Sequence, residues 1–150
     1  MCLTISKNNL KPITAEQNIV CYKVLRKFPN RDTLEAPLYI FKYCFGMIYA
    51  TPEDYFEDAD ICDDGECLVE YGFHSFVRLE DAVNFKCLLN KAFKPDKKNY
   101  DYVVVKCTIP NASRYYKGKQ KFNRNESDFP DGYCSESIRI DEIVNENETQ

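Results

Sequence analysis

The alternation of apolar and polar residues along the chain predicts β-strands in four places. Residues 18–25 (NIVCYKVL) are rich in β-branched and aromatic side chains, and Pro29 follows the end of this strand. Residues 100–109 show the clearest alternation, with valines on both faces. Residues 67–76 and 133–144 repeat the same period of two. These segments predict a protein built mainly from β-structure.

A helical period replaces the alternation over residues 79–93. Ala82, Phe85 and Leu89 recur at helical spacing, acidic residues stand in the first turn, and a proline follows the segment. This segment predicts the one main helix. Because strands and a single helix follow one another without a repeat or a linker, we expect one strand-rich α+β domain over residues 1–144.

Other segments have a less regular pattern. Residues 38–50 are apolar on both faces and contain Gly46, which fits either a bent buried strand or a short helix. Residues 113–118 predict a short edge strand. Polar loops are predicted at 51–66 and 119–132, and a frayed acidic tail at 145–150.

The net charge of −4 hides a strong separation of charge along the chain. Residues 51–70 carry nine acidic side chains and no Lys or Arg, whereas residues 86–124 carry eleven basic side chains and two acidic ones. Residues 125–150 have a net charge of −7. The composition, 44% hydrophobic and 14% aromatic, excludes a disordered, collagen-like or low-complexity chain. We therefore expect a folded core and a charge-polarised surface.

The first ten residues (MCLTISKNNL) contain no apolar run of the kind that a signal peptide needs, and no eighteen apolar residues run together. We expect a cytoplasmic protein, in the host cytoplasm if the chain is phage-encoded, without membrane contact and with its eight cysteines reduced. Cys62, Cys67, His74 and Cys87 are residue types that bind zinc, but their spacing matches no compact zinc motif. No metal is expected.

Two charged residues fall at predicted core-facing positions. Glu136 is in phase with Ile138 and Ile140, and Lys23 shares a strand face with Cys21. Burying an unpaired charge is expensive, so such residues normally have a partner or a function. Glu136 could instead lie in water at the strand end. An ion pair between Lys23 and Glu136 would explain both residues without any function.

The only histidine, His74, lies beside Ser75 in the predicted strand at 67–76. A histidine can act as a general base, bind a metal or hydrogen-bond within a core, and the sequence favours the last role. Neighbouring residues on a strand point to opposite faces, so the two side chains are poorly placed for a nucleophile–base pair.

Basic and aromatic residues are interleaved over residues 86–124. Phosphates bind cations and bases stack on aromatic rings, so single-stranded nucleic acid is one possible partner of this segment. The alternative is a solvent-exposed basic face whose charge is balanced by the acidic segments of the same molecule. The sequence pI of about 5.1 favours this alternative.

Several segments in order, MCL, IVCYKVL, YGFHSF, VVVKCTIP and YCSESIRIDEIV, resemble a group of small proteins of bacteriophage and Bacteroidota type. The same order is similar in layout to the ADP-ribosyltransferase fold, which has a polar anchor on its first strand, a small-hydroxyl motif on a later strand followed by a helix, and a glutamate at a late strand. The resemblance implies NAD as the cofactor, bound by Tyr22 and Lys23. It also implies Lys23, His74, Ser75 and Glu136 as the catalytic residues, although Lys23 stands where the family has Arg or His.

These observations leave three functional hypotheses. The preferred one is a small phage-type accessory protein that binds a protein partner through its charge-polarised surface. The alternative is an NAD-dependent enzyme of the ADP-ribosyltransferase type. A further alternative is binding of single-stranded nucleic acid by residues 86–124.

Overall fold

A computed structural model of the chain describes residues 2–6, 10–38, 41–52, 56, 60–61, 67–93, 99–121 and 129–148. The strands of the first half are β1 (Cys2–Ile5), β2 (Ile13–Thr14), β3 (Ile19–Lys27), β4 (Leu34–Glu35), β5 (Lys42–Tyr43), β6 (Ile48–Ala50) and β7 (Asp60–Ile61). The second half contains β8 (Cys67–Val69), β9 (Phe73–Phe76), α1 (Leu79–Ala92), β10 (Asp101–Ile109), β11 (Arg114–Lys121), β12 (Asp131–Ser135) and β13 (Ser137–Ile143). A 3-10 turn, Glu146–Glu148, follows β13.

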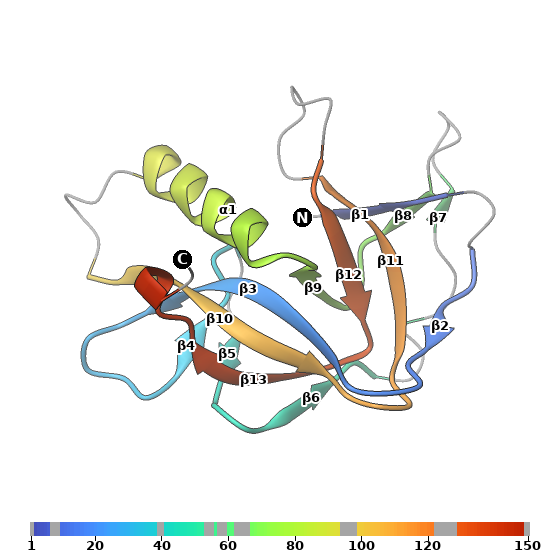
Figure 1. The fold of residues 1–150 in the computed structure, drawn as a ribbon, viewed down its shortest axis with the longest axis horizontal. Helices are drawn as coiled ribbons and strands as arrows, with labels where there is room; N and C mark the ends of the chain where they lie inside the picture. The colour runs from blue at the N-terminus through green and yellow to red at the C-terminus, as the bar shows by residue number, and fades with distance from the viewer. Residues whose placement is uncertain are drawn as a thin grey trace.

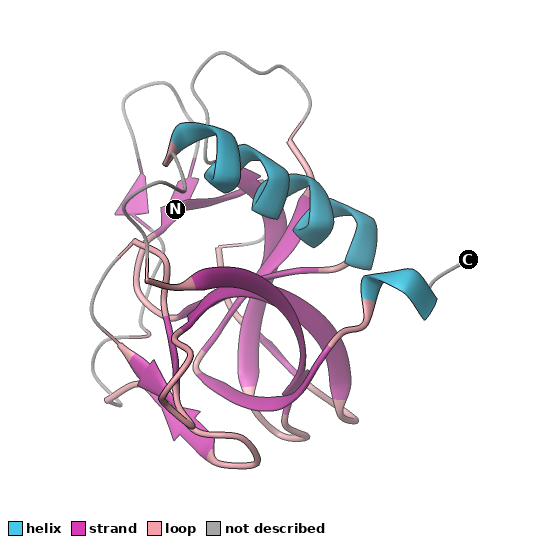
Figure 2. Cartoon of the chain, turned by 90° about the vertical axis from the view of Figure 1, so that its left-hand side faces the viewer, coloured by secondary structure: helices cyan, strands magenta, loops and turns pink. Residues whose placement is uncertain are grey.

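The strands form one sheet in the order β6-β13-β10-β3-β9-β12-β11-β1-β8-β7, with the short strands β2, β4 and β5 off this path. Helix α1 lies over one side of β3 and β10 (Figure 1). The sheet is strongly curved, as Figure 2 shows. The strand-rich α+β class expected from the sequence is confirmed.

The central residues of strand β3 and of its partner β10 are buried on both faces. Cys21, Leu25 and Val105 belong to one core cluster, and Val24 and Val104 belong to a second cluster beneath α1. Alternate side chains of each strand therefore enter different cores, which explains why β-branched and aromatic residues occupy both faces of these segments.

Helix α1 confirms the predicted helix at 79–93 within one residue. Its buried positions are Ala82, Phe85 and Leu89, three or four residues apart, so they form one stripe. Phe85 packs on Phe76 with ring centroids 5.4 Å apart. The sequence of α1 thus carries its own docking face for the sheet.

Two predicted strands are each two strands in the structure. The segment 133–144 is divided at Glu136 into β12 and β13, which pair with different neighbours. The segment 67–76 is divided at Gly72, which has φ +132°. A continuous strand cannot occupy two separate positions in a sheet. The apolar–polar alternation continues through both breaks in the sequence, so it wrongly predicted one strand in each segment.

Three other expectations change. Strand β11 lies between β12 and β1 and is not an edge strand, and it extends into the predicted loop 119–132. The apolar segment 38–50 contains β5 and β6 with a turn at Gly46 (φ +77°) between them. The start of the 145–150 tail is anchored, because Lys86 Nζ lies 2.6 Å from a Glu146 carboxylate oxygen. Most of the acidic segment 51–70 lies outside the described residues.

Candidate functional site

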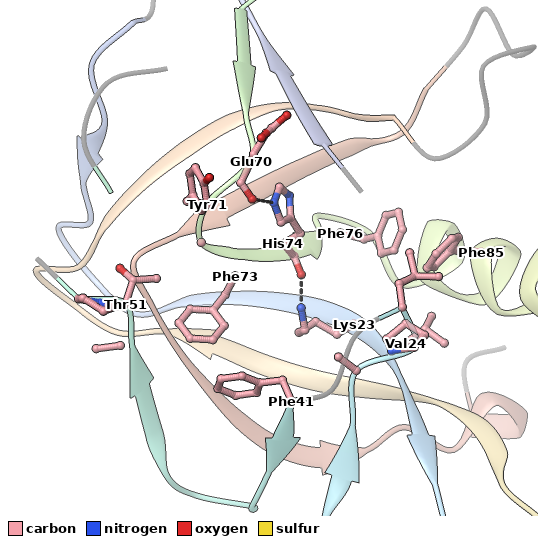
Figure 3. A pocket seen from close by; sticks show the side chains of 16 residues that line it. Lys23, Val24, Phe41, Thr51, Glu70, Tyr71, Phe73, His74, Phe76 and Phe85 are labelled. Atoms are coloured by element: carbon pink, nitrogen blue, oxygen red, sulfur yellow. Dashed lines mark hydrogen bonds between the residues drawn. The ribbon is translucent and has the colours of Figure 1, made fainter. Parts of the chain in front are cut away.

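The sheet opens between β3 and β9. These neighbours share one register pair, Tyr22 with Phe76, whereas β9 pairs with β12 at four positions. Main-chain groups that lose a ladder partner need another one. Lys23 Nζ donates a hydrogen bond to the His74 carbonyl oxygen across the opening (Figure 3). A side chain thus takes over a bond that a paired strand would have supplied.

A pocket of about 600 Å³ occupies this opening. Its walls come from β3, from residues 36–38 and 41, from the end of β6, from the turn at residues 70–72, from β9 and from α1. Most of the lining is apolar, and Lys23 and His74 are its buried polar members. A concave, mainly apolar site with a few polar groups is typical of small-molecule binding sites.

Aromatic rings form one wall of the pocket. The ring centroids of Phe41 and Phe73 are 5.9 Å apart in an edge-on arrangement. Tyr43 and Tyr49 lie behind Phe41, at centroid distances of 4.7 and 5.6 Å. Figure 3 shows the Phe41 and Phe73 rings on one side of Lys23 and Phe85 on the other. The packed rings behind this wall hold it in place.

Lys23 is buried, with 7% of its surface exposed. Besides the His74 carbonyl, its ammonium faces the ring of Tyr43, 5.9 Å from the centroid. Within the described part of the chain, no carboxylate forms an ion pair with it. The ion pair between Lys23 and Glu136 that the sequence suggested is therefore wrong. Among the described residues, a carbonyl and an aromatic ring are the groups that hold the buried cation of Lys23.

His74 is buried and hydrogen-bonded, as the sequence favoured. Its Nε2 lies 3.1 Å from the Glu70 carbonyl oxygen, which can only accept, so Nε2 carries the proton. Burial lowers the pKa of His74 to about 4, while the Glu70 carbonyl opposes this shift and the charge of Lys23 adds to it. His74 is therefore neutral at pH 7.

Gly72 allows the turn that brings Glu70 to His74. A Cβ atom on Gly72 would lie 2.6 Å from the sulfur of Cys134 and 3.0 Å from the Ser135 carbonyl oxygen. Its φ of +132° is also strained for any residue with a side chain. The thiol of Cys134 donates to the Tyr71 carbonyl oxygen at 3.2 Å and holds the same turn.

Ser75 and Tyr22 do not line the pocket. Ser75 is 1% exposed and lies beside the thiol of Cys21. Tyr22 packs with the cluster beneath α1. Of the Tyr22–Lys23 pair only Lys23 lines the pocket, and of the His74–Ser75 pair only His74 does.

Glu136 lies outside the pocket lining, and its carboxylate is bound by Arg114. Its Oε1 accepts the Arg114 backbone N–H at 2.8 Å, and its Oε2 accepts from Arg114 Nε at 3.0 Å. The side chain of Glu136 is 23% exposed. The carboxylate that the sequence left unexplained thus joins the start of β11 to the end of β12.

No family model, no curated protein and no solved structure matches this chain. The described residues contain no group of three or more side chains able to hold a metal ion. Among the described residues, the α-helix is α1, and it is not long and apolar enough to cross a membrane.

Sequence reasoning missed the aromatic wall and the opening itself. Phe41 and Phe73 lie in apolar segments, where a phenylalanine is ordinarily a core residue. Nothing in either segment shows that the strands beside them separate. The one local signal was Lys23, a charge at a core-facing position.

Proposed function

We propose that this protein is a small-molecule-binding domain whose ligand occupies the pocket between β3 and β9. The observation that carries the proposal is the opening of the sheet beside an aromatic wall, with the buried ammonium of Lys23 at its centre. A buried polar group in an apolar cavity is costly to the fold, and ligand binding is a common reason to keep one.

An ADP-ribosyltransferase-like arrangement is the scaffold that we propose for this domain. The anchor strand β3, the hydroxyl-bearing strand β9 with α1 after it, and β12 with Glu136 after it are consecutive neighbours in the sheet. That adjacency supports the layout, and the resemblance would make NAD the ligand. Turnover of NAD would also require Glu136 to leave Arg114 and reach the pocket, so the geometry favours binding over catalysis.

The test uses a variant that blocks the pocket. Ala50 is exposed on β6 and lines the pocket, whereas Ile48 is exposed on the same strand face and does not. We expect Ala50→Trp to abolish binding and Ile48→Trp to leave it unchanged. Ligand-observed NMR with NAD, nicotinamide, 2-naphthoate and 2-naphthylmethanol measures this. Absence of binding by all four compounds to the wild-type protein would contradict the proposal, and nicotinamide release from NAD would support the enzyme.

A second candidate function is binding of an acidic protein partner, as in a phage-type accessory protein. Lys117, Lys119 and Lys121 alternate along β11 and therefore share one face of the sheet. Lys117 is exposed, and Lys119 keeps 54% of its side chain exposed while it pairs with Asp131. This lysine stripe gives a partner with an acidic surface a row of cations.

Charge reversal of the lysine stripe tests the second candidate. A specific partner should bind the wild type, be lost from Lys117→Glu/Lys119→Glu/Lys121→Glu, and be kept by a control with Lys11, Lys27 and Lys42 reversed, all of them exposed. Loss from both variants would indicate a general charge effect. Salt-dependent binding of a dT oligonucleotide by the wild type would instead favour the nucleic-acid alternative.

A further inference from the structure

We infer that the pocket selects a ligand with one negative charge on an apolar, ring-bearing body, an aromatic carboxylate, whose charged group contacts Lys23. The inference rests on the proposed function, since it names the class of ligand for the same site.

Lys23 places a positive charge at the pocket, and no carboxylate of the described residues pairs with it. An ammonium group carries three N–H donors, and one of them is directed to the His74 carbonyl oxygen. The carbonyl and the Tyr43 ring attract the cation but leave its charge uncompensated. A buried cation is stabilised most by an anion at hydrogen-bond distance, because the low local dielectric strengthens that contact. The ligand's carboxylate would supply this anion.

The other polar groups around the pocket do not compete for this role. His74 is neutral at pH 7 because burial holds its pKa at about 4. Glu70 is exposed, and its carboxylate points away from Lys23 in Figure 3. Thr51 is uncharged. One cation with no opposing carboxylate favours a ligand with a single negative charge.

The walls select the rest of the ligand. Phe41 and Phe73 offer edges and faces on which a flat ring can pack, and Leu38 and Ala50 extend the apolar surface. A dinucleotide carries two phosphates and two riboses, which would need many polar partners, and this lining does not supply them. The volume of about 600 Å³ accommodates a bicyclic aromatic acid with room to spare.

A comparison of 2-naphthoate, 2-naphthylmethanol and NAD as ligands of four proteins tests the inference. 2-Naphthoate and 2-naphthylmethanol have the same ring system and differ in charge. The proteins are the wild type, Lys23→Met and Lys27→Met, the last an exposed lysine on the same strand that does not line the pocket. Lys23→Gln serves as a second variant. Titration calorimetry measures the affinities, and circular dichroism checks the fold.

The wild type should prefer 2-naphthoate over 2-naphthylmethanol roughly 10- to 100-fold, the range for a hydrogen bond to a charged group. Lys23→Met and Lys23→Gln should lose this preference while they still bind 2-naphthylmethanol, which shows an intact pocket, and Lys27→Met should behave as the wild type.

Three outcomes overturn the inference. Equal affinity of the wild type for the two naphthalene ligands would refute charge selection and leave the pocket function standing. Tighter binding of NAD than of 2-naphthoate would refute the monoanion class in favour of the cofactor. An unchanged preference in folded Lys23→Met and Lys23→Gln would show that Lys23 is not the contact. Absence of binding by every compound, in contrast, is the failure of the proposed function itself.

Discussion

Strand β3 is paired with β10 at nine register positions but with β9 at one. On the closed side, Cys21 and Leu25 on β3 and Val105 on β10 are completely buried in one core. On the open side, the pocket enters between Lys23 and His74, and a lysine side chain takes the place of a ladder bond. The same strand is thus fully paired along its β10 edge and nearly unpaired along its β9 edge, where the pocket lies.

This difference follows from the neighbours more than from β3 itself. Strand β10 matches β3 in length, with nine residues each. Strand β9 has four residues, all of which pair with β12, and the turn at Gly72 precedes it while α1 follows it. A four-residue strand can pair along only part of the nine-residue β3, and β9 does so at one position. The rest of this edge of β3 is left without β9 beside it, and the pocket lies there.

The largest expected effect is on the closed side. Leu25→Ala should lower the free energy of unfolding by about 2–5 kcal/mol, because it leaves a cavity in a fully packed core. Val20→Ala, on the same strand but 47% exposed, should cost less than about 0.5 kcal/mol. Urea unfolding measures both. Similar losses for the two variants would mean that the buried core beside β3 and β10 does not carry the stability.

The next effect is on the open side and depends on pH. The pKa of folded His74 is about 4, below its ordinary value of 6.5, so the unfolded chain binds this proton first as the pH falls. The buried, neutral His74 therefore makes its full contribution to the free energy of unfolding above pH 6.5. This contribution, about 3 kcal/mol in all, should be lost as the pH falls from 6.5 to 4.

Unfolding free energies of the wild type and His74→Gln, measured from pH 7 to pH 4, check this expectation. The difference between the two proteins should shrink as the pH falls. A constant difference over this range would show that His74 is not held in its neutral form.

The smallest effect concerns Glu136. Glu136→Gln weakens a partly exposed pair with Arg114, so it should cost about 1 kcal/mol of stability and leave the binding of 2-naphthoate unchanged. Urea unfolding and titration calorimetry measure the two quantities. If the wild type consumes NAD and the folded variant does not, Glu136 acts in catalysis. The functional site would then extend beyond the pocket beside β3.

Local patterns in the sequence were sufficient for the regular elements. Helix α1 and strands β3 and β10 lie where the hydrophobic period predicts them, because each carries its own buried stripe or alternating faces. The pattern failed at Gly72 and Glu136, where it continues in phase across a break. Alternation reports which face of a strand is buried, but not which strand lies beside it.

The candidate site, too, could be predicted from the sequence only in part. Lys23 and His74 stood out in the sequence, as a charge at a core-facing position and as the only histidine, and both line the pocket. Glu136 stood out for the same reason as Lys23. The partner that satisfies it, Arg114, is 22 residues away, and no pattern along the chain connects the two.

The sequence by itself determined the class of the fold, the helix, the central strands and the presence of a cation among apolar neighbours, because these depend on residue type and short-range spacing. The tertiary structure decided which charged residue is compensated and which is not. Charge compensation depends on atoms brought together from distant segments, and here that assembly pairs Glu136 with Arg114 and leaves Lys23 at an opening in the sheet.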